Sequence, residues 1–374
     1  MRKKIRLEEL CEKDSSNLKQ RDLHEKKDGY PIYGASGLIG YVDFYKQENE
    51  YIGIVKDGAG VGRVCILPAK SSVIGTMQYI LPKEGVDTHY LYHALVALNL
   101  GKYCTGATIP HIYFKDYKSE LLPFYSYAEQ KKIGREFDEV VALIEKRREQ
   151  LSEIDNLVKS QFIEMFEGKN FPEMSLDELS FGKGEYGAQS ASIPYDKNRP
   201  RYVRITDIND DGTLNEDFVS SINTEDDLAY KLSEGDFLFA RMGATVGKTY
   251  AYKKGNEIFA GYLIRYKLNC QMIVPEYLFW FTKTPTYLTW VKLNQSGAAQ
   301  PGINAKKYGS LRIPIPPIEE QRRFTRFVEQ TDKSKFPCLI QEKMLKKLYF
   351  SLINAKTIVK KSQKSYNRRK EAVI

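Results

Sequence analysis

The segment Thr105-Gly-Ala-Thr-Ile-Pro-His-Ile-Tyr-Phe-Lys-Asp-Tyr117 occurs a second time, 191 residues later, as Ser296-Gly-Ala-Ala-Gln-Pro-Gly-Ile-Asn-Ala-Lys-Lys-Tyr308. Both versions carry a Gly-Ala pair ahead of a proline and end on tyrosine. A repeat at a fixed offset decides whether a chain is one domain or several copies of one.

Other matches keep the same order along the chain. At the same offset Pro123 and Glu129-Gln130 recur as Pro314 and Glu320-Gln321, and at an offset of 185 Gly58-Ala-Gly-Val-Gly62 recurs as Gly243-Ala-Thr-Val-Gly247. Small loop insertions produce such a drifting offset. We therefore predict two diverged copies of one unit in this chain.

Each copy is predicted to contain an α+β domain followed by a long helix. Short β-like runs such as Tyr51–Val55 and Phe237–Ala240 are separated by glycine turns. A helix is expected at Thr88–Leu100 and, in the second copy, at Pro275–Val291. The fold class is thus α+β, with two globular domains in tandem pseudo-repeat.

The first long helix is predicted to begin at a capping box formed by Ser126 and Glu129. Apolar residues then recur every three or four positions up to Met165, a pattern typical of a helix that packs along another helix. The second long helix follows Pro316-Pro317, and Pro337 inside it is expected to kink or split it. The predicted segments are domain 1 (residues 1–125), helix 1 (126–168), domain 2 (169–316), helix 2 (317–362) and a basic tail (363–374).

Net charge does not by itself indicate DNA binding. The 374 residues include 57 Lys and Arg against 48 Asp and Glu, a net charge of +9. From Lys343 onward ten basic residues face one acid, so the rest of the chain is neutral. We expect residues 363–374 to form a solvated arm.

Five scattered cysteines and the lack of a long apolar run favour a cytoplasmic, non-membrane protein.

Several segments resemble motifs of catalytic or cofactor-binding sites, but each match is incomplete. Gly243–Thr249 is one residue shorter than a P-loop, so its glycines are expected to serve a tight turn. The Gly-rich stretch at Asp57 resembles an S-adenosylmethionine loop, but no Asn/Asp-Pro-Pro-aromatic motif accompanies it. His89 and His93 lack a third metal ligand nearby in the sequence. We predict no catalytic, cofactor-binding or metal-binding residues.

Taken in order, the duplicated motifs resemble the specificity (S) subunit of type I restriction–modification enzymes. The segments that carry the resemblance are Tyr30–Gly40, Asp57–Gly62, Thr105–Ile112, Arg201–Ile208 and Pro314–Gln321, together with the helices behind each Glu-Gln pair. The first copy departs from the family pattern, since Phe124-Tyr125-Ser126-Tyr127 stands where a double proline is usual.

The resemblance implies two target recognition domains, each reading one half of an asymmetric bipartite site in double-stranded DNA. It implies that two conserved helices pack antiparallel and space the domains. It further implies a non-catalytic chain that docks two methyltransferase (modification) subunits and the restriction/translocase subunits. S-adenosylmethionine, ATP and Mg²⁺ would then belong to those partner subunits. A helix of about 40 residues is about 60 Å long, enough to set two readers one DNA turn apart.

Candidate DNA contacts are polar and basic residues beside the glycine turns, because Arg reads guanine, Asn or Gln reads adenine, and Lys binds phosphate. In domain 1 they are Ser36, Lys56, Arg63, Lys102, Tyr103, Thr105, Thr108, His111 and Lys115. In domain 2 they are Arg199, Arg201, Arg204, Thr206, Arg241, Thr245, Lys248, Gln295, Ser296, Gln300, Asn304 and Lys306. Asp57 and Asp207 suit structural roles in turns better than DNA contact.

Two other functions stay open at this point. The chain could be the specificity part of a type II-like methyltransferase or nuclease, or a structural coiled-coil scaffold.

Overall fold

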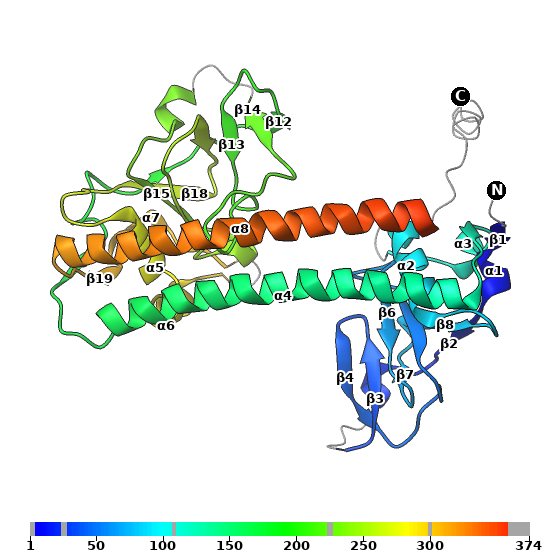
Figure 1. Ribbon diagram of the computed structural model, residues 1–374. Coiled ribbons are helices and arrows are strands. Elements are labelled where there is room, and N and C mark those ends of the chain that lie inside the picture. Colours follow the sequence, from blue (N-terminus) through cyan, green and yellow to red (C-terminus); the bar gives the residue numbers. More distant parts are fainter. Residues whose placement is uncertain (1–3, 24–27, 107–109, 223–226, 298–300, 358–374) are drawn as a thin grey trace. The chain divides into compact units, whose positions relative to one another are not determined.

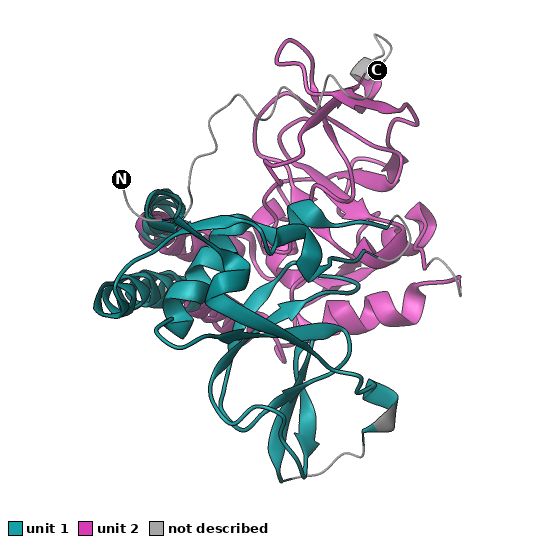
Figure 2. Cartoon of the chain, turned by 90° about the vertical axis from the view of Figure 1, so that its right-hand side faces the viewer, with its two compact units in different colours: residues 1–149, 338–374 teal, residues 150–337 magenta. Residues whose placement is uncertain are grey.

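The computed structural model describes residues 4–23, 28–106, 110–222, 227–297 and 301–357. The predicted contacts Thr108 and Gln300 and the basic tail lie outside these residues. The chain divides into two compact units, residues 1–149 with 338–374 (unit 1) and residues 150–337 (unit 2). Figure 2 shows that each unit contains one α+β domain and part of both long helices.

Unit 1 contains two small sheets. The first has the antiparallel order β2-β8-β5-β6 and the second the order β4-β3-β7, in which β3 and β7 are parallel. Strands β1 and β9 pair at the junction with the long helix. The bounds are β1 (Lys4–Arg6), α1 (Leu7–Leu10), β2 (Cys11–Ser15), β3 (Tyr30–Gly34), β4 (Gly37–Val42), β5 (Tyr51–Val55), β6 (Val64–Leu67), β7 (Ser72–Val73), β8 (Met77–Pro82), α2 (Thr88–Leu98), α3 (Phe114–Tyr117) and β9 (Leu121–Pro123).

Unit 2 repeats this arrangement. Its sheets have the orders β11-β18-β15-β16 and β12-β14-β13-β17, with β13 and β17 parallel, and β10 pairs with β19. The bounds are β10 (Glu173–Ser175), β11 (Glu185–Tyr186), β12 (Ser192–Pro194), β13 (Arg201–Val203), β14 (Ser220–Ile222), β15 (Asp236–Ala240), β16 (Thr249–Ala251), β17 (Glu257–Phe259), β18 (Leu263–Lys267), α5 (Pro275–Phe281), α6 (Pro285–Asn294), α7 (Ala305–Gly309) and β19 (Arg312–Pro314). The predicted duplication is therefore confirmed at the level of strand pairing.

Two helices of 40 residues each, α4 (Tyr127–Phe166) and α8 (Ile318–Thr357), follow the two domains in the chain (Figure 1). The capping box forms as predicted, because Ser126 N–H donates to Glu129 (3.0 Å) and Glu129 N–H donates to Ser126 Oγ (3.4 Å). Gly168 then adopts a φ of +70°, which ends the helical path.

The two long helices pack against each other in opposite directions within each unit. In unit 1 the ring of Phe137, near the start of α4, lies 5.8 Å from that of Tyr349, near the end of α8. In unit 2 the ring of Phe162, near the end of α4, lies 5.2 Å from that of Phe324, near the start of α8. The expected antiparallel packing is thus confirmed.

Two helix predictions need correction. The helix expected at Pro275–Val291 is two helices, because Thr284 caps a new helix at Tyr287 N–H and Pro285 occupies its first turn. The helix containing Pro337 does not split, since α8 continues through it. Pro337 is exposed, so water can satisfy the carbonyl that its missing N–H leaves free.

The duplicated Glu-Gln motifs have a structural role that the sequence did not reveal. Gln130 and Gln321 are fully buried. Gln130 accepts from Asp87 N–H (3.0 Å) and donates to Gly85 O and Tyr125 O, and Gln321 accepts from Val274 N–H (2.9 Å) and donates to Met272 O and Pro316 O. Each glutamine therefore clamps the first turn of a long helix to the loop before a domain helix.

Candidate nucleic-acid interface

The two motifs that define the repeat meet in space in unit 1. Asp57, in the glycine-rich turn, forms a β-bridge with His111, and His111 also bridges Thr105. Gly58 N–H donates to Pro110 O (2.9 Å), and Ile112 N–H donates to Lys56 O (3.0 Å). We call residues 55–62 with 110–112 the loop junction of unit 1.

The same hydrogen bonds recur in unit 2 between different residues. Met242 and Ser296 both bridge Gly302. Gly243 N–H donates to Pro301 O (2.9 Å), and Ile303 N–H donates to Arg241 O (2.9 Å). Residues 240–247 with 301–303 form the loop junction of unit 2. Duplication has therefore kept the backbone of this site and changed its side chains.

The glycines of each loop junction serve a tight hairpin turn, as predicted. Gly62 and Gly247 have φ values of +86° and +87°. Their N–H groups donate back across the turn to Val55 O (2.9 Å) and Ala240 O (3.0 Å). Each turn joins two antiparallel strands, whereas a P-loop joins a strand to a helix.

Among the candidates of unit 1, Lys56, Thr105 and His111 gather at the loop junction. His111 is hydrogen-bonded to Asp57, and Lys56 Nζ lies 3.8 Å from the same carboxylate. Asp57 therefore has the internal role that its position in the turn suggested.

The other candidates of unit 1 lie around this junction on different elements. Arg63 donates to Ala35 O (3.0 Å), which places it beside the exposed Ser36 in the turn between β3 and β4. Lys102 lies over the Tyr103 ring, whose hydroxyl bonds to Glu120. The last candidate, Lys115, lies over the ring of Tyr113, an exposed aromatic residue that the sequence did not single out.

Three arginine candidates of unit 2 lie on β13 of the second sheet or directly beside it in the chain, and all three have acidic partners. Arg201 lies 2.7 Å from Glu216, Arg204 lies 2.9 Å from Asp207, and Arg199 lies 3.7 Å from Asp196. Arg199 and Arg201 line a cavity of about 270 Å³ on this sheet. The remaining candidate there, Thr206, donates to Asp207 (3.3 Å), which confirms the internal role of that aspartate.

The remaining candidates of unit 2 lie near its loop junction. Thr245 Oγ donates to Met242 O (3.3 Å), and Lys248 pairs with Asp210 (2.8 Å). Asn304 caps α7 by accepting from Lys307 N–H (2.9 Å). Gln295, Ser296 and Lys306 are exposed. Two tyrosine rings lie beside Arg241, those of Tyr186 on β11 and Tyr262 in the turn before β18. They were missed in the sequence because both are far from Arg241 along the chain and no local spacing links them to it.

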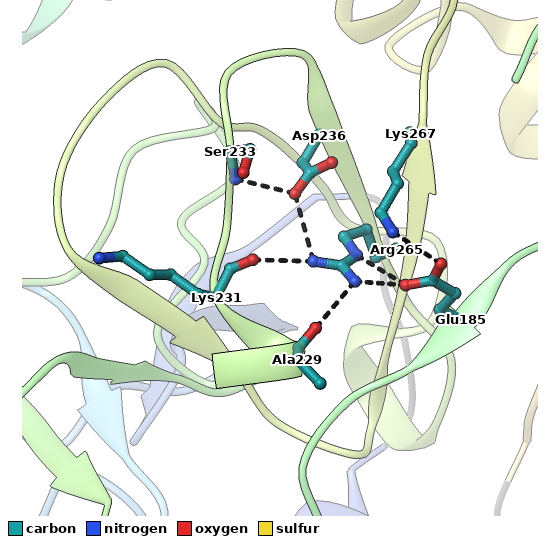
Figure 3. A network of polar contacts seen from close by, with 7 residues as sticks. All are labelled: Glu185, Ala229, Lys231, Ser233, Asp236, Arg265 and Lys267. Atoms are coloured by element: carbon teal, nitrogen blue, oxygen red, sulfur yellow. Dashed lines mark hydrogen bonds and ion pairs between the residues drawn. The ribbon is translucent and has the colours of Figure 1, made fainter. Parts of the chain in front are cut away.

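A buried charge network fixes the strands that lead into this site (Figure 3). Arg265 is 4% exposed and bonds to Glu185 and Asp236, and also to the backbone carbonyls of Ala229 and Lys231. Burial raises the pKa of Asp236, while the pKa of Glu185 is lowered by its bonds to Arg265 and Lys267, which outweigh its desolvation. Arg265 is therefore committed to joining β11, β15 and β18 and is not a DNA-contact candidate.

His89 and His93 both make bonds inside unit 1. Both rings contact Asp138 of α4, at 2.7 Å and 2.9 Å, and His93 also contacts the Tyr349 hydroxyl of α8 at 2.8 Å. Over residues 4–357, apart from the gaps given above, no group of three His, Cys, Asp or Glu side chains is arranged to hold a metal ion.

None of the described helices combines the length and apolar character needed to cross a membrane.

His93 makes the stability of unit 1 sensitive to pH. Burial lowers the pKa of His93, with Asp138 opposing that effect. The unfolded imidazole binds a proton below a pH of about 6.5, whereas the folded one resists it, so stability should fall as the pH drops below that value, by up to about 1.4 kcal/mol per pH unit. Urea unfolding at pH 7.5, 6.5 and 5.5 measures this slope. The variant His93→Phe should show a shallower slope, and an equal slope in both proteins contradicts the assignment.

The comparisons with known proteins agree with this architecture. A family model of the type I restriction modification DNA specificity domain matches residues 2–156 and again residues 171–348. The chain therefore belongs to the family of type I restriction–modification DNA specificity domains, of which it carries two copies.

Individual relatives are distant. The type I restriction enzyme EcoBI specificity subunit of Escherichia coli is 25% identical in an alignment of 285 residues that covers 66% of this chain and 59% of that protein. The MjaVIII specificity subunit of Methanocaldococcus jannaschii is 24% identical over 171 residues, 46% of this chain and 34% of the relative. The chain thus matches less than two thirds of either relative's length. The crystal structure of the S subunit of a type I restriction–modification system from M. genitalium covers 96% of both chains at 15% identity, with a TM-score of 0.54, a likeness of fold.

Proposed function

We propose that this chain is the DNA-recognition subunit of a type I restriction–modification complex. In this proposal it binds an asymmetric bipartite site in double-stranded DNA, and each unit reads one half-site. The chain itself catalyses no reaction. Partner subunits in the cytoplasm supply the methyl transfer and the restriction, together with S-adenosylmethionine, ATP and Mg²⁺.

The observation that carries the proposal is the pair of loop junctions, which share backbone bonds but not side chains. At equivalent positions unit 1 has Lys56 and His111, where unit 2 has Arg241 and Gly302. Base edges are discriminated by the hydrogen-bonding groups that face them. Two equal frameworks with unlike side chains are therefore suited to two different half-sites, and the target would be asymmetric.

An exposed apolar row on the second long helix supports the proposal that partner subunits dock on this chain. Four apolar side chains at four-residue spacing on α8 stay exposed in unit 1: Ile340 (41%), Met344 (65%), Leu348 (48%) and Leu352 (36%). An apolar row of this kind on a helix surface is typical of a protein–protein contact. We assign it to a methyltransferase subunit, and by the duplication we expect two such subunits in the complex.

Mapping of N6-methyladenine in the genome of the host tests the proposal. Deletion of the gene should remove methylation from one bipartite motif with two unlike half-sites, and return of the gene on a plasmid should restore it. A plasmid carrying the gene with an early stop codon is the control. If methylation of every bipartite motif survives the deletion, the proposal is refuted. Binding of S-adenosylmethionine to the isolated chain in calorimetry would refute the non-catalytic role.

A further inference from the structure

Arg241 is the one arginine candidate of unit 2 for which the described residues provide no acidic partner. Arg199, Arg201, Arg204 and Lys248 each lie within 4 Å of a carboxylate. A guanidinium whose charge is already balanced by a carboxylate has fewer donors to offer a ligand. Within the described part of the chain, the charge of Arg241 is therefore not balanced by a carboxylate at the loop junction.

The backbone and the base of the Arg241 side chain are fixed. Its N–H donates to Tyr262 O (3.0 Å), and its carbonyl accepts from Ile303 N–H (2.9 Å). Its Nε donates to Gly261 O (3.1 Å). The bond to Gly261 O occupies Nε and, as far as the described residues go, leaves the two terminal Nη groups as the available pair of donors.

Two tyrosine rings hold the guanidinium. Its central carbon lies 4.8 Å from the centre of the Tyr186 ring and 6.0 Å from that of Tyr262. Tyr186 is itself anchored, because its hydroxyl accepts from Ala305 N–H (3.1 Å). The two tyrosines remain 41% and 52% exposed, so the site faces solvent. Aromatic contacts of this kind fix the plane of a guanidinium more firmly than they fix an ammonium group.

We propose that Arg241 reads a guanine in the half-site of unit 2, with its two Nη groups donating to O6 and N7. Tyr186 and Tyr262 are positioning residues that set the plane of the guanidinium. A planar pair of fixed donors matches the paired acceptors of guanine in the major groove. The inference rests on the proposed function and names one base class within it.

The duplication sharpens this inference. The counterpart of Arg241 in unit 1 is Lys56, which lies 3.8 Å from Asp57. An ammonium group is a point donor without a plane, and here it already has a carboxylate beside it. The guanine read in this way therefore belongs to the half-site of unit 2 only.

Methylation by the complex, purified through a tag on the full chain from its host, tests the proposal. The substrates are a set of duplexes with every single-base change in the motif. Arg241→Lys should reduce the preference for guanine at one position about ten- to a hundredfold and leave all other positions unchanged. Tyr262→Leu should reduce the same preference to a smaller degree. Arg312→Lys, at an exposed arginine paired with Glu173 and Glu178, is the matched control.

A chemical probe separates base reading from phosphate binding. Replacement of that guanine by 7-deazaguanine removes the N7 acceptor, so it should slow the wild-type complex but not the Arg241→Lys complex. If Arg241→Lys slows methylation of all duplexes equally, Arg241 contacts a phosphate and the proposal is overturned. Loss of base preference at a position in the half-site of unit 1 would overturn it as well. A wild-type complex without sequence preference would instead refute the proposed function. Unchanged subunit composition and unfolding temperature of each variant confirm that it is folded.

Discussion

Exchange of residues 1–125 for the matching domain of a relative with another target should replace one half of the methylated sequence and leave the other half intact. The reason is that each unit has its own hydrophobic clusters and its own loop junction. A reading domain with its own core should keep its specificity when it is moved. Genome-wide mapping of N6-methyladenine in cells carrying the hybrid measures both halves at once.

The reciprocal exchange of residues 169–316 is the control. It should change the other half-site and retain the one that the first exchange altered. The exchanged segments keep the backbone carbonyls and N–H groups to which Gln130 and Gln321 bind, so the hybrid helices can dock as before. A hybrid that alters both half-sites would show that the units do not read independently.

Gln321→Leu should destabilise unit 2 by about 3–5 kcal/mol. The side chain is fully buried and makes three hydrogen bonds. Leucine has a similar size but leaves Val274 N–H and the carbonyls of Met272 and Pro316 without a partner, at about 1–3 kcal/mol for each buried group. Urea unfolding of the full chain, followed by circular dichroism, measures the loss.

Gln330→Leu on the same helix is the matched control, because Gln330 is exposed and its side chain lies outside the clamp. Its effect should stay within about 0.5 kcal/mol. Gln130→Leu should repeat the large effect in unit 1, where Asp87 N–H and two carbonyls lose the same partner. Equal stabilities of Gln321→Leu and Gln330→Leu would show that the clamp contributes little.

The duplication, the capping box and the hairpin role of the glycines were all predictable, because each depends on short-range patterns. Ser126 and Glu129 are three residues apart and complete their motif within one helical turn. The positive φ values of Gly62 and Gly247 follow from a turn that other residues rarely adopt. The break between α5 and α6 was missed although Thr284-Pro285 is a local signal for a helix start.

The candidate DNA contacts could not be ranked in the same way. In the sequence Arg201, Arg204 and Arg241 are equally plausible contacts. In the structure the first two have carboxylate partners, whereas the third lies near the rings of Tyr186 and Tyr262. Asp207 is three residues from Arg204, whereas Glu216 is fifteen residues from Arg201 and Tyr186 is on another strand. Spacing along the chain could have indicated the first of these contacts but not the other two.

The amino-acid sequence by itself determined that this protein is built from two copies of one unit, and that each copy ends in a long amphipathic helix. The copies can be recognised because matching residues keep the same order along the chain after the two have diverged. Only the tertiary structure decided which arginine side chains are already paired with a carboxylate and which one lies beside two tyrosine rings instead. The physical reason is that periodicity and capping act over a few residues, whereas ion pairing and ring contacts depend on distances that the folded strands create.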